Sequence, residues 1–263
     1  MAMTDISYAD GARHKLDVYP ARQITDAPVI VFFYGGRWQS GAKGWYSIFA
    51  KTLAANGYVV VVPDYRLYPE VRFPDFVADG ARALHWTREN VATFGGDPRR
   101  LFVMGHSAGA YIAAMLALDP QWLNGIGLEA NRDIAGLIGV SGPYDFLPLR
   151  DSALVDIFGG ADRRVTQPIS FAEGRKSSAL LLTGAADDIV DPGNSTRLAD
   201  KLRRNGNDAV ELIYPRLGHI TVLAGFAPVL GHFFPALQDV NAFVERAQPA
   251  AVEPLSTFSG TVS

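Results

Sequence analysis

The sequence predicts an α/β fold, in which a mostly parallel, doubly wound sheet carries helices on both faces. Two observations lead to this prediction. Short, continuously apolar runs that are typical of buried strands alternate along the chain with longer segments of helical character. Near the N-terminus, Asp10-Gly11 and the alternating segment Lys15–Tyr19 are instead typical of an antiparallel hairpin, which we expect at the edge of the sheet.

The expected strands are apolar runs rich in Val, Ile, Phe and Leu. After the hairpin within Ile6–Tyr19 they are Val29–Tyr34, Tyr58–Val62, Leu101–Met104, Ile134–Val140, Ala179–Thr183 and Val210–Tyr214. The expected helices are Gly44–Asn56, Pro74–Phe94, Ala110–Leu118, Ser195–Asn205 and Val240–Arg246. Gly57 and Gly95-Gly96 directly follow two of these helices, at positions where glycine commonly ends a helix.

The domain organisation expected from this alternation is a single domain over residues 1–247. Residues 143–176 are irregular and contain several Pro and Gly residues, so we expect a small insertion there that could form a lid. Residues 248–263 are rich in Pro, Ala, Ser and Thr, and we expect them to be a disordered tail. The chain has no internal repeat and no low-complexity linker.

Composition narrows the class of protein. The 263 residues are 48% hydrophobic, enough for a sizeable core, and the formal net charge is −3 without a long basic run. Nucleic acid and acidic membrane surfaces are therefore not expected partners. The chain has no cysteine, which excludes disulfides and thiolate metal sites. No apolar run approaches the ~18 residues of a membrane span, and the N-terminus lacks the apolar core of a signal peptide. We expect a cytoplasmic protein.

The segment with the clearest chemical signal is Gly105-His106-Ser107-Ala108-Gly109. It lies between an expected buried strand and an Ala-rich helix, which is the context of a nucleophile elbow. In such a turn the serine hydroxyl stands at a helix N-terminus, where developing negative charge is favoured. The same pattern can also be an ordinary strand-to-helix turn, so Ser107 needs a base, an acid and an oxyanion hole elsewhere in the chain.

These partners follow in an order that resembles the α/β-hydrolase superfamily. Gly35-Gly36 comes first, then the Ser107 pentapeptide, Asp187 and finally His219. The chain is similar to bacterial carboxylesterases related to the hormone-sensitive-lipase group, to feruloyl-esterase-like proteins and to arylformamidases. The resemblance covers nearly all of Val29–Val244, and the order Ser, Asp, His is the one that this fold uses.

Among the five histidines, the resemblance implies that His219 is the base that takes the proton of Ser107. His232, in an apolar run, is the alternative. His14 is expected in an exposed hairpin and His85 on a helix. His106 occupies the variable position of the elbow, and its side chain should point away from the serine.

The acid that orients the base is expected after the strand Ala179–Thr183. The family pattern of glycine, two residues, catalytic Asp, two residues and Val falls on Asp187, with Gly184 before it and Val190 after it. Asp188 is the alternative, which would otherwise be a solvated loop carboxylate.

The oxyanion hole requires backbone N–H groups directed at the tetrahedral oxygen. The resemblance implies Ala108, Gly36 and Arg37 as donors. Two residues depart from the family pattern: Tyr34 replaces the usual His, and Arg37 stands where the hormone-sensitive-lipase group has Gly. The hydroxyl of Tyr34 could brace the loop by hydrogen bonding; alternatively, Tyr34 only packs, with its hydroxyl in solvent.

The candidates for contact with substrate are Trp38, His106 and Tyr144. The segment Asp64-Tyr65-Arg66 is expected to have a structural role. No residues have the spacing of a metal site, and no cofactor is implied.

The resemblance and the residues together predict a serine carboxylesterase that hydrolyses short-chain or aromatic carboxylic esters through an acyl-enzyme. Its partner would be a small ester, and the oligomeric state, monomer or homodimer, stays open. An arylformamidase with the same residues is one alternative. A binding module without catalysis is another, and the altered Tyr34 loop is the best argument for it. Because the insertion after Val140 is short, we expect a shallow pocket.

Overall fold

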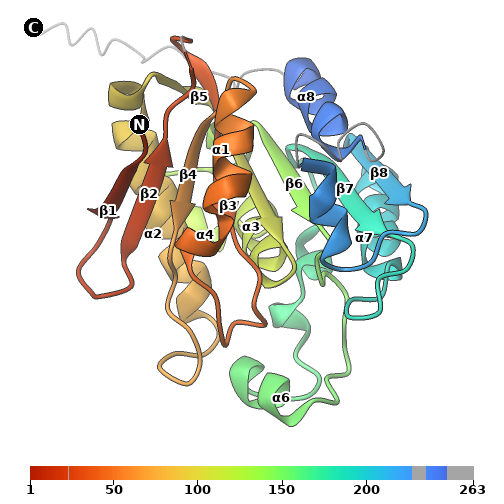
Figure 1. The fold of residues 1–263 in the computed structure, drawn as a ribbon. Coiled ribbons are helices and arrows are strands. Elements are labelled where there is room, and N and C mark those ends of the chain that lie inside the picture. Colours follow the sequence, from red (N-terminus) through yellow and green to blue (C-terminus); the bar gives the residue numbers. More distant parts are fainter. Residues whose placement is uncertain (23, 227–234, 248–263) are drawn as a thin grey trace, which may run out of the picture.

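The computed structural model describes residues 1–22, 24–226 and 235–247. Within these residues eight strands form one sheet in the order β1-β2-β4-β3-β5-β6-β7-β8, drawn in Figure 1. The strands are β1 (Met3–Ser7), β2 (Lys15–Tyr19), β3 (Ala27–Phe33), β4 (Val59–Pro63), β5 (Gly96–His106), β6 (Gly136–Val140), β7 (Ser178–Gly184) and β8 (Ala209–Tyr214). The β1/β2 and β2/β4 pairs are antiparallel and all other pairs are parallel. The predicted α/β-hydrolase fold, with its antiparallel edge, is confirmed.

The central strands are buried because their sequences are apolar on both faces. In the middle of the sheet Val31 pairs with Val61 of β4 on one side and with Val103 of β5 on the other. Strand β5 begins at Gly96, five residues before its predicted start, because Gly96 pairs with Ala27 of β3 ahead of an irregularity in the register. Hydrophobicity alone identifies the apolar part of a strand, not its polar beginning.

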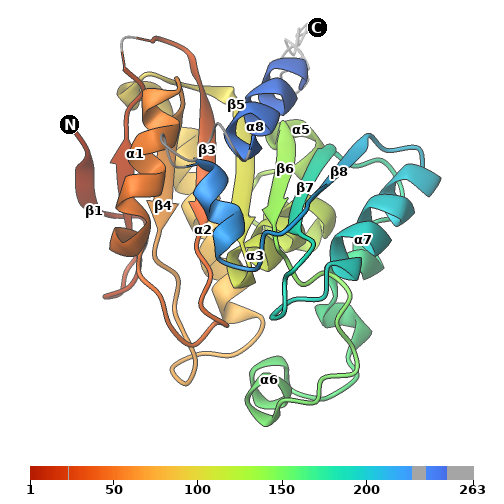
Figure 2. The same ribbon diagram turned by 45° about the vertical axis from the view of Figure 1, so that its right-hand side comes forward.

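Helices cover both faces of the sheet. The helices are α1 (Ser47–Ala55), α2 (Asp75–Asn90), α3 (Ala108–Leu118), α4 (Gln121–Asn124), α5 (Ala130–Asp133), α6 (Ser152–Phe158), α7 (Gly193–Arg204) and α8 (Ala236–Arg246). Short 3-10 segments are η1 (Lys43–Tyr46), η2 (Val91–Phe94), η3 (Arg164–Thr166), η4 (Pro168–Phe171) and η5 (Thr221–Phe226). Helices α1 and α8 lie on one face, and α2, α3 and α7 lie on the other (Figures 1 and 2). All residues of α3 are buried, which explains why its sequence is almost entirely apolar.

The irregular stretch 143–176 contains α6, η3 and η4. Helix α6 begins after Asp151, whose side chain accepts a hydrogen bond from the N–H of Leu154 at 3.1 Å, and ends at Gly159 with a left-handed φ of 68°. In Figures 1 and 2 it projects below the sheet, at the edge where the parallel strands end. This stretch therefore lies where α/β sheets place their ligands.

The fold differs from the sequence-based expectations in three further places. The helix expected over Pro74–Phe94 is α2 followed by a 3-10 turn, η2, which ends before Gly95 at φ 83°. The short helices α4 and α5 were not predicted. His14 was expected to be exposed but is buried, with only 7% of its surface accessible. Its Nε2 lies 3.0 Å from Oδ1 of Asp79, a fully buried carboxylate of α2.

Some expectations are not decided by this fold. His232 and the predicted tail over residues 248–263 lie outside the described residues. None of the helices within the described ranges is long and apolar enough to cross a bilayer. The cytoplasmic location stays a prediction.

Candidate active site

Ser107 stands alone on a sharp turn between β5 and α3. Its backbone has φ 55° and ψ −122°, a strained conformation for a residue with a side chain, and its N–H donates to the carbonyl of Val140 at 2.9 Å. Only glycine fits at the positions two residues before and two residues after it. A Cβ at Gly109 would lie 2.0 Å from the carbonyl oxygen of Phe33, and a Cβ at Gly105 would lie 2.2 Å from Gly109. Gly105 and Gly109 are thus a steric requirement of the elbow.

His219 reaches Ser107 from the turn that follows β8. Its Nε2 lies 2.8 Å from Oγ of Ser107, and its side chain is 5% exposed. At this distance the imidazole can accept the serine proton. The turn is closed locally, because the N–H of Gly218 donates to Oγ1 of Thr221 at 2.7 Å.

Asp187 holds the other side of the imidazole. Nδ1 of His219 lies 2.9 Å from Oδ2 and 3.1 Å from Oδ1 of Asp187. Oδ1 also accepts the backbone N–H groups of Ile189 and Val190, at 3.1 and 2.9 Å. Burial alone would raise the pKa of the Asp187 carboxyl, but the N–H of Val190 and the imidazole of His219 outweigh it and lower that pKa. The carboxylate therefore stays ionised and can stabilise an imidazolium.

The structure separates the competing candidates. Asp188 is exposed and makes no hydrogen bond with His219, whereas Asp187 is buried against it. His85 is exposed on α2, and His14 pairs with Asp79 in the N-terminal part of the molecule. Among the described histidines, only His219 and His106 lie at the elbow.

His106 supports His219 from behind and does not face the pocket. Its Nε2 lies 2.9 Å from the carbonyl oxygen of His219, and the two rings are 4.9 Å apart. Burial, followed by the neighbouring His219, lowers the pKa of His106 to about 4. The ring is therefore neutral near pH 7, and Nε2–H can donate to the carbonyl of His219. The expectation that His106 contacts substrate is corrected by its 1% exposure: it is enclosed by protein.

The loop after β3 approaches Ser107 closely. A Cβ on Gly35 would lie 3.0 Å from Cβ of Ser107. Gly36, Arg37 and Trp38 have φ of 135°, 56° and 60°, and the carbonyl of Gly36 accepts the N–H groups of Gln39 and Ser40 at 3.0 Å. Three consecutive positive φ values turn the chain sharply at the position where an oxyanion hole is expected. Among the described residues, the N–H groups of Gly36, Arg37 and Ala108 have no protein acceptor, so they are available to a ligand.

Tyr34 braces this loop. It is fully buried, its hydroxyl donates to Oδ1 of Asp64 at 2.7 Å, and it accepts a hydrogen bond from Nη2 of Arg13 at 2.7 Å. The alternative that its hydroxyl points into solvent is therefore wrong. Tyr65 donates to the carbonyl of Tyr34 at 2.8 Å, in agreement with the structural role expected for Asp64-Tyr65-Arg66.

A cavity of about 400 Å³ opens beside Ser107. Its walls come from the loop after β3, from the elbow, from the insertion and from the start of α7; the lining residues are Arg37, Trp38, Ser107, Ala108, Pro143, Asp145, Phe146, Leu147, Pro148, Leu149, Arg150, Leu154, Ile189, Val190, Asp191, Asn194 and Arg197. Across the described part of the chain, no three His, Asp or Glu side chains are grouped so that they could hold a metal ion.

The three residues expected to contact substrate differ in their placement. Trp38 lines the cavity and packs edge-on against Tyr111 and Phe158, with ring centroids 5.2 and 4.9 Å away. Tyr144 is fully buried behind the wall, with its hydroxyl against Gly139, so the expectation of direct contact is corrected for it as for His106.

Two residues that shape the site escaped the sequence analysis. The side-chain oxygen of Asn194 accepts the N–H groups of Tyr144 and Asp145, at 2.9 and 2.8 Å, and so fixes the wall of the cavity. Arg13, in the N-terminal hairpin, bonds to Tyr34. Each acts across a long separation in sequence, and neither lies in a recognisable motif. Neither residue could have been identified from the spacing of residues in the sequence.

A serine on a strand–turn–helix elbow, hydrogen-bonded to a histidine that is in turn hydrogen-bonded to an aspartate, defines an α/β-hydrolase. More specifically, the chain belongs to the BD-FAE family, whose model matches residues 16–202.

Named relatives and solved structures agree with this class. A probable isoprenylcysteine alpha-carbonyl methylesterase of Oryza sativa subsp. japonica is 30% identical over 267 residues, which cover 93% of this chain and 63% of the relative. A probable carboxylic ester hydrolase, LipM, of Mycobacterium tuberculosis (strain ATCC 25618 / H37Rv) is 28% identical over 275 residues, with 95% and 63% covered. The chain thus spans less than two thirds of the length of these relatives. The apo form of Thermogutta terrifontis esterase 2 superposes with a TM-score of 0.79 at 22% identity, covering 96% of this chain and 97% of that one, which shows a shared fold.

Proposed function

We propose that the protein is a serine carboxylesterase that hydrolyses short-chain or aromatic carboxylic esters through an acyl-enzyme. The observation that carries this proposal is the position of the His219 ring, with Nε2 2.8 Å from Oγ of Ser107 and Nδ1 2.9 Å from Oδ2 of Asp187. This arrangement can activate a serine that would otherwise be a poor nucleophile. The printed names of the relatives, a methylesterase and a carboxylic ester hydrolase, also support ester chemistry.

In the first half of the reaction, Oγ of Ser107 attacks the ester carbonyl carbon while Nε2 of His219 takes the serine proton. The ionised Asp187 stabilises the imidazolium that forms. When the tetrahedral intermediate collapses, the bond to the alkoxy oxygen breaks, His219 returns the proton to that oxygen, and the alcohol leaves. Ser107 then carries the acyl group.

The negative oxygen of the tetrahedral intermediate would be bound by the N–H groups of Gly36, Arg37 and Ala108. All three lack a protein acceptor among the described residues, and Ala108 opens helix α3, whose N-terminus favours negative charge. Donors fixed before the reaction stabilise the transition state more than the substrate.

In the second half, a water molecule attacks the acyl carbonyl and His219 accepts its proton. The second tetrahedral intermediate collapses with loss of Oγ of Ser107, which recovers the proton from His219. The carboxylic acid product leaves and the free enzyme is restored.

The proposed substrate class follows from the cavity. A volume of about 400 Å³ has room for a short acyl chain or one aromatic ring, and Phe146, Leu147 and Leu154 supply apolar wall. Trp38, at the same wall, could favour an aromatic group.

A panel of p-nitrophenyl esters of rising acyl length, assayed beside N-formylkynurenine, tests the proposal. We expect kcat/KM to be higher for the four-carbon ester than for the twelve-carbon ester, and higher for the esters than for the formamide. Preference for N-formylkynurenine would assign the arylformamidase reaction instead. Absence of turnover with every compound, together with binding of one of them, would favour a binding module. A higher kcat/KM on the twelve-carbon ester would contradict the shallow-pocket interpretation.

A further inference from the structure

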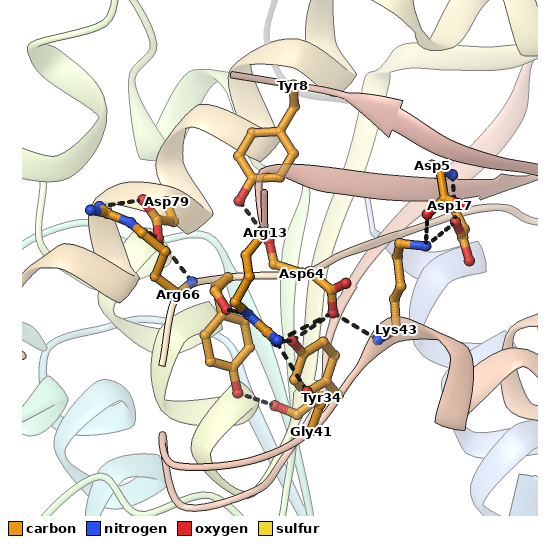
Figure 3. Close-up of polar contacts among 11 residues, drawn as sticks. Asp5, Tyr8, Arg13, Asp17, Tyr34, Gly41, Lys43, Asp64, Arg66 and Asp79 are labelled. Atoms are coloured by element: carbon orange, nitrogen blue, oxygen red, sulfur yellow. Dashed lines mark hydrogen bonds and ion pairs between the residues drawn. The ribbon is translucent and has the colours of Figure 1, made fainter. Parts of the chain in front are cut away.

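The guanidinium group of Arg13 joins both ends of the loop that follows β3. Nη2 of Arg13 donates to the hydroxyl of Tyr34 at 2.7 Å and to the carbonyl of Gly41 at 3.0 Å, and its Nε donates to the carbonyl of Tyr65 at 2.8 Å. Tyr34 is the first residue of the loop and Gly41 is near its end. Figure 3 shows the guanidinium group of Arg13 next to Tyr34 and Gly41, with Asp64 beside it.

The loop between these two ends needs such support. Gly36, Arg37 and Trp38 all have positive φ, and two of these residues carry side chains that disfavour this conformation. The backbone hydrogen bonds inside the turn, from Gln39 and Ser40, both go to the carbonyl of Gly36. They close the turn but do not fix its direction relative to Ser107. The carbonyl of Trp38 accepts the N–H of Tyr68 at 2.8 Å, and Arg13 holds the two ends of the loop at Tyr34 and Gly41. Together these contacts determine where the N–H groups of Gly36 and Arg37 point.

Asp64 also contacts both Tyr34 and Arg13 at the start of the loop. Its Oδ1 accepts the hydroxyl of Tyr34 at 2.7 Å and the backbone N–H of Lys43 at 2.8 Å, and lies 3.6 Å from Nη2 of Arg13. The side chains of Arg13 and Asp64 are 29% and 15% exposed, so their attraction is only partly screened by solvent. Burial, and then the charge of Asp64, raise the pKa of Tyr34 far above its ordinary value, so that its hydroxyl keeps its proton. It can thus donate to Asp64 while accepting from Arg13.

Close packing makes the anchor rigid. The ring of Tyr34 lies against Gly41, where a Cβ would be 2.6 Å from Cε2, and it stacks on Tyr65 with centroids 4.7 Å apart. The loop can take few other positions while Arg13 joins these three residues.

We propose that Arg13 is a positioning residue for the oxyanion hole, so that the N-terminal hairpin takes part in catalysis without touching substrate. This inference rests on the proposed function. Arg13 precedes residue 16, where the match to the BD-FAE model begins, so family membership does not assign it a role. The predicted consequence is specific: loss of Arg13 should weaken transition-state stabilisation and leave substrate binding nearly intact.

The test compares Arg13→Gln and Arg13→Lys with Tyr8→Phe. The hydroxyl of Tyr8 donates to the carbonyl of Asp64 at 2.6 Å, so Tyr8→Phe removes a hydrogen bond between the same hairpin and the same segment without touching the loop. We expect Arg13→Gln to lower kcat at least about tenfold, with KM within about twofold of wild type. Arg13→Lys keeps the charge next to Asp64 but lacks the planar fork, so its kcat should be intermediate. Tyr8→Phe should keep kcat within about twofold.

Amide hydrogen exchange over residues 35–42 supplies a second readout that does not depend on turnover. Exchange should be faster in Arg13→Gln than in wild type, and unchanged in Tyr8→Phe. If Arg13→Gln kept both kcat and the exchange rates of wild type, the proposal would be overturned. It would also be overturned if Tyr8→Phe lost as much kcat as Arg13→Gln, or if KM rose while kcat stayed constant. A wild-type protein without esterase turnover would contradict the proposed function, while the exchange comparison would still decide whether Arg13 holds the loop.

Discussion

The elbow around Ser107 and the loop over residues 34–43 lie side by side at the cavity, yet they are held in place by different means. At the elbow, small residues within two positions of Ser107 permit the backbone contacts that force its strained conformation. The loop also has positive φ values and closely packed glycines, but the side chain that joins its two ends, Arg13, lies 21 and 28 positions before the residues that it binds.

The difference teaches where information about a site resides. A constraint set by close backbone approach leaves a short motif, because only glycine or another small residue fits. A constraint set by hydrogen bonds from remote elements leaves no motif, because any side chain with the right donors can supply it from anywhere in the fold. We expect substitutions at the elbow to lower kcat more than substitutions that loosen the loop.

The largest effect is expected at the centre of the elbow. Ser107→Ala should lower kcat about 10⁴-fold or more, because the proposed nucleophile is lost and Ser107, His219 and Asp187 are expected to act as a unit. The free energy of unfolding should change little, since one small residue replaces another. Steady-state kinetics and thermal unfolding of the purified variant provide the measurement. A folded variant with a tenth of the wild-type kcat would remove Ser107 from the mechanism.

Substitution of Asp187, the proposed acid, should have the next largest effect on kcat. Asp187→Asn should lower kcat about 10³- to 10⁴-fold, because an amide favours the wrong tautomer of His219. Asp188→Asn is the matched control: its side chain is exposed and should cost less than about tenfold. The two variants are to be assayed side by side, and the reverse ranking would transfer the role to Asp188.

The brace of the loop should have a smaller effect. Tyr34→Phe removes the hydroxyl that donates to Asp64 and accepts from Arg13. Loss of a hydrogen bond of this kind should lower the free energy of unfolding by about 0.5–1.5 kcal/mol. Since a fully lost oxyanion donor costs about 10²- to 10³-fold, two loosened donors should lower kcat roughly tenfold to a hundredfold, with less change in KM. An unchanged kcat would show that other contacts suffice to hold the loop.

The smallest effect concerns His106, where the elbow itself depends on a remote contact. Its pKa in the folded protein is about 4, below its ordinary value, because it is buried. As pH falls below about 6.5, the His106 imidazole binds a proton in the unfolded chain but stays neutral in the folded protein. The free energy of unfolding therefore falls until about pH 4. This group contributes up to about 1.4 kcal/mol per pH unit to the slope.

The experiment is denaturant unfolding of wild type and His106→Gln between pH 4 and pH 7. The variant cannot titrate there, so its stability should fall less steeply with acidification. His85→Gln, at an exposed position of α2, is the control and should follow wild type. Parallel curves for wild type and His106→Gln would contradict the assignment of a neutral, buried His106.

Much of the sheet and the elbow at Ser107 could be predicted from the sequence, because buried parallel strands and a nucleophile elbow leave local patterns. The roles predicted for Asp187 and His219 came from the resemblance to the α/β-hydrolase superfamily. The surroundings of His14 could not. A histidine in a polar hairpin looks exposed, and only the folded chain brings Asp79 of α2 to it. Tyr144 was expected to contact substrate, yet its side chain is buried behind the wall that Asn194 fixes. Orientation of this kind depends on contacts between elements, which neither spacing nor composition records.

The central claim, that Ser107 is the nucleophile of an acyl-transfer site, is tested most directly by covalent labelling. The protein is treated with a fluorophosphonate, and the modified residue is located by mass spectrometry of its peptides, with Ser107→Ala as control. We predict a single adduct on Ser107 in the wild-type protein, slowed by a competing ester, and no adduct in the variant. Labelling at another residue, or equal labelling of Ser107→Ala, would contradict the account.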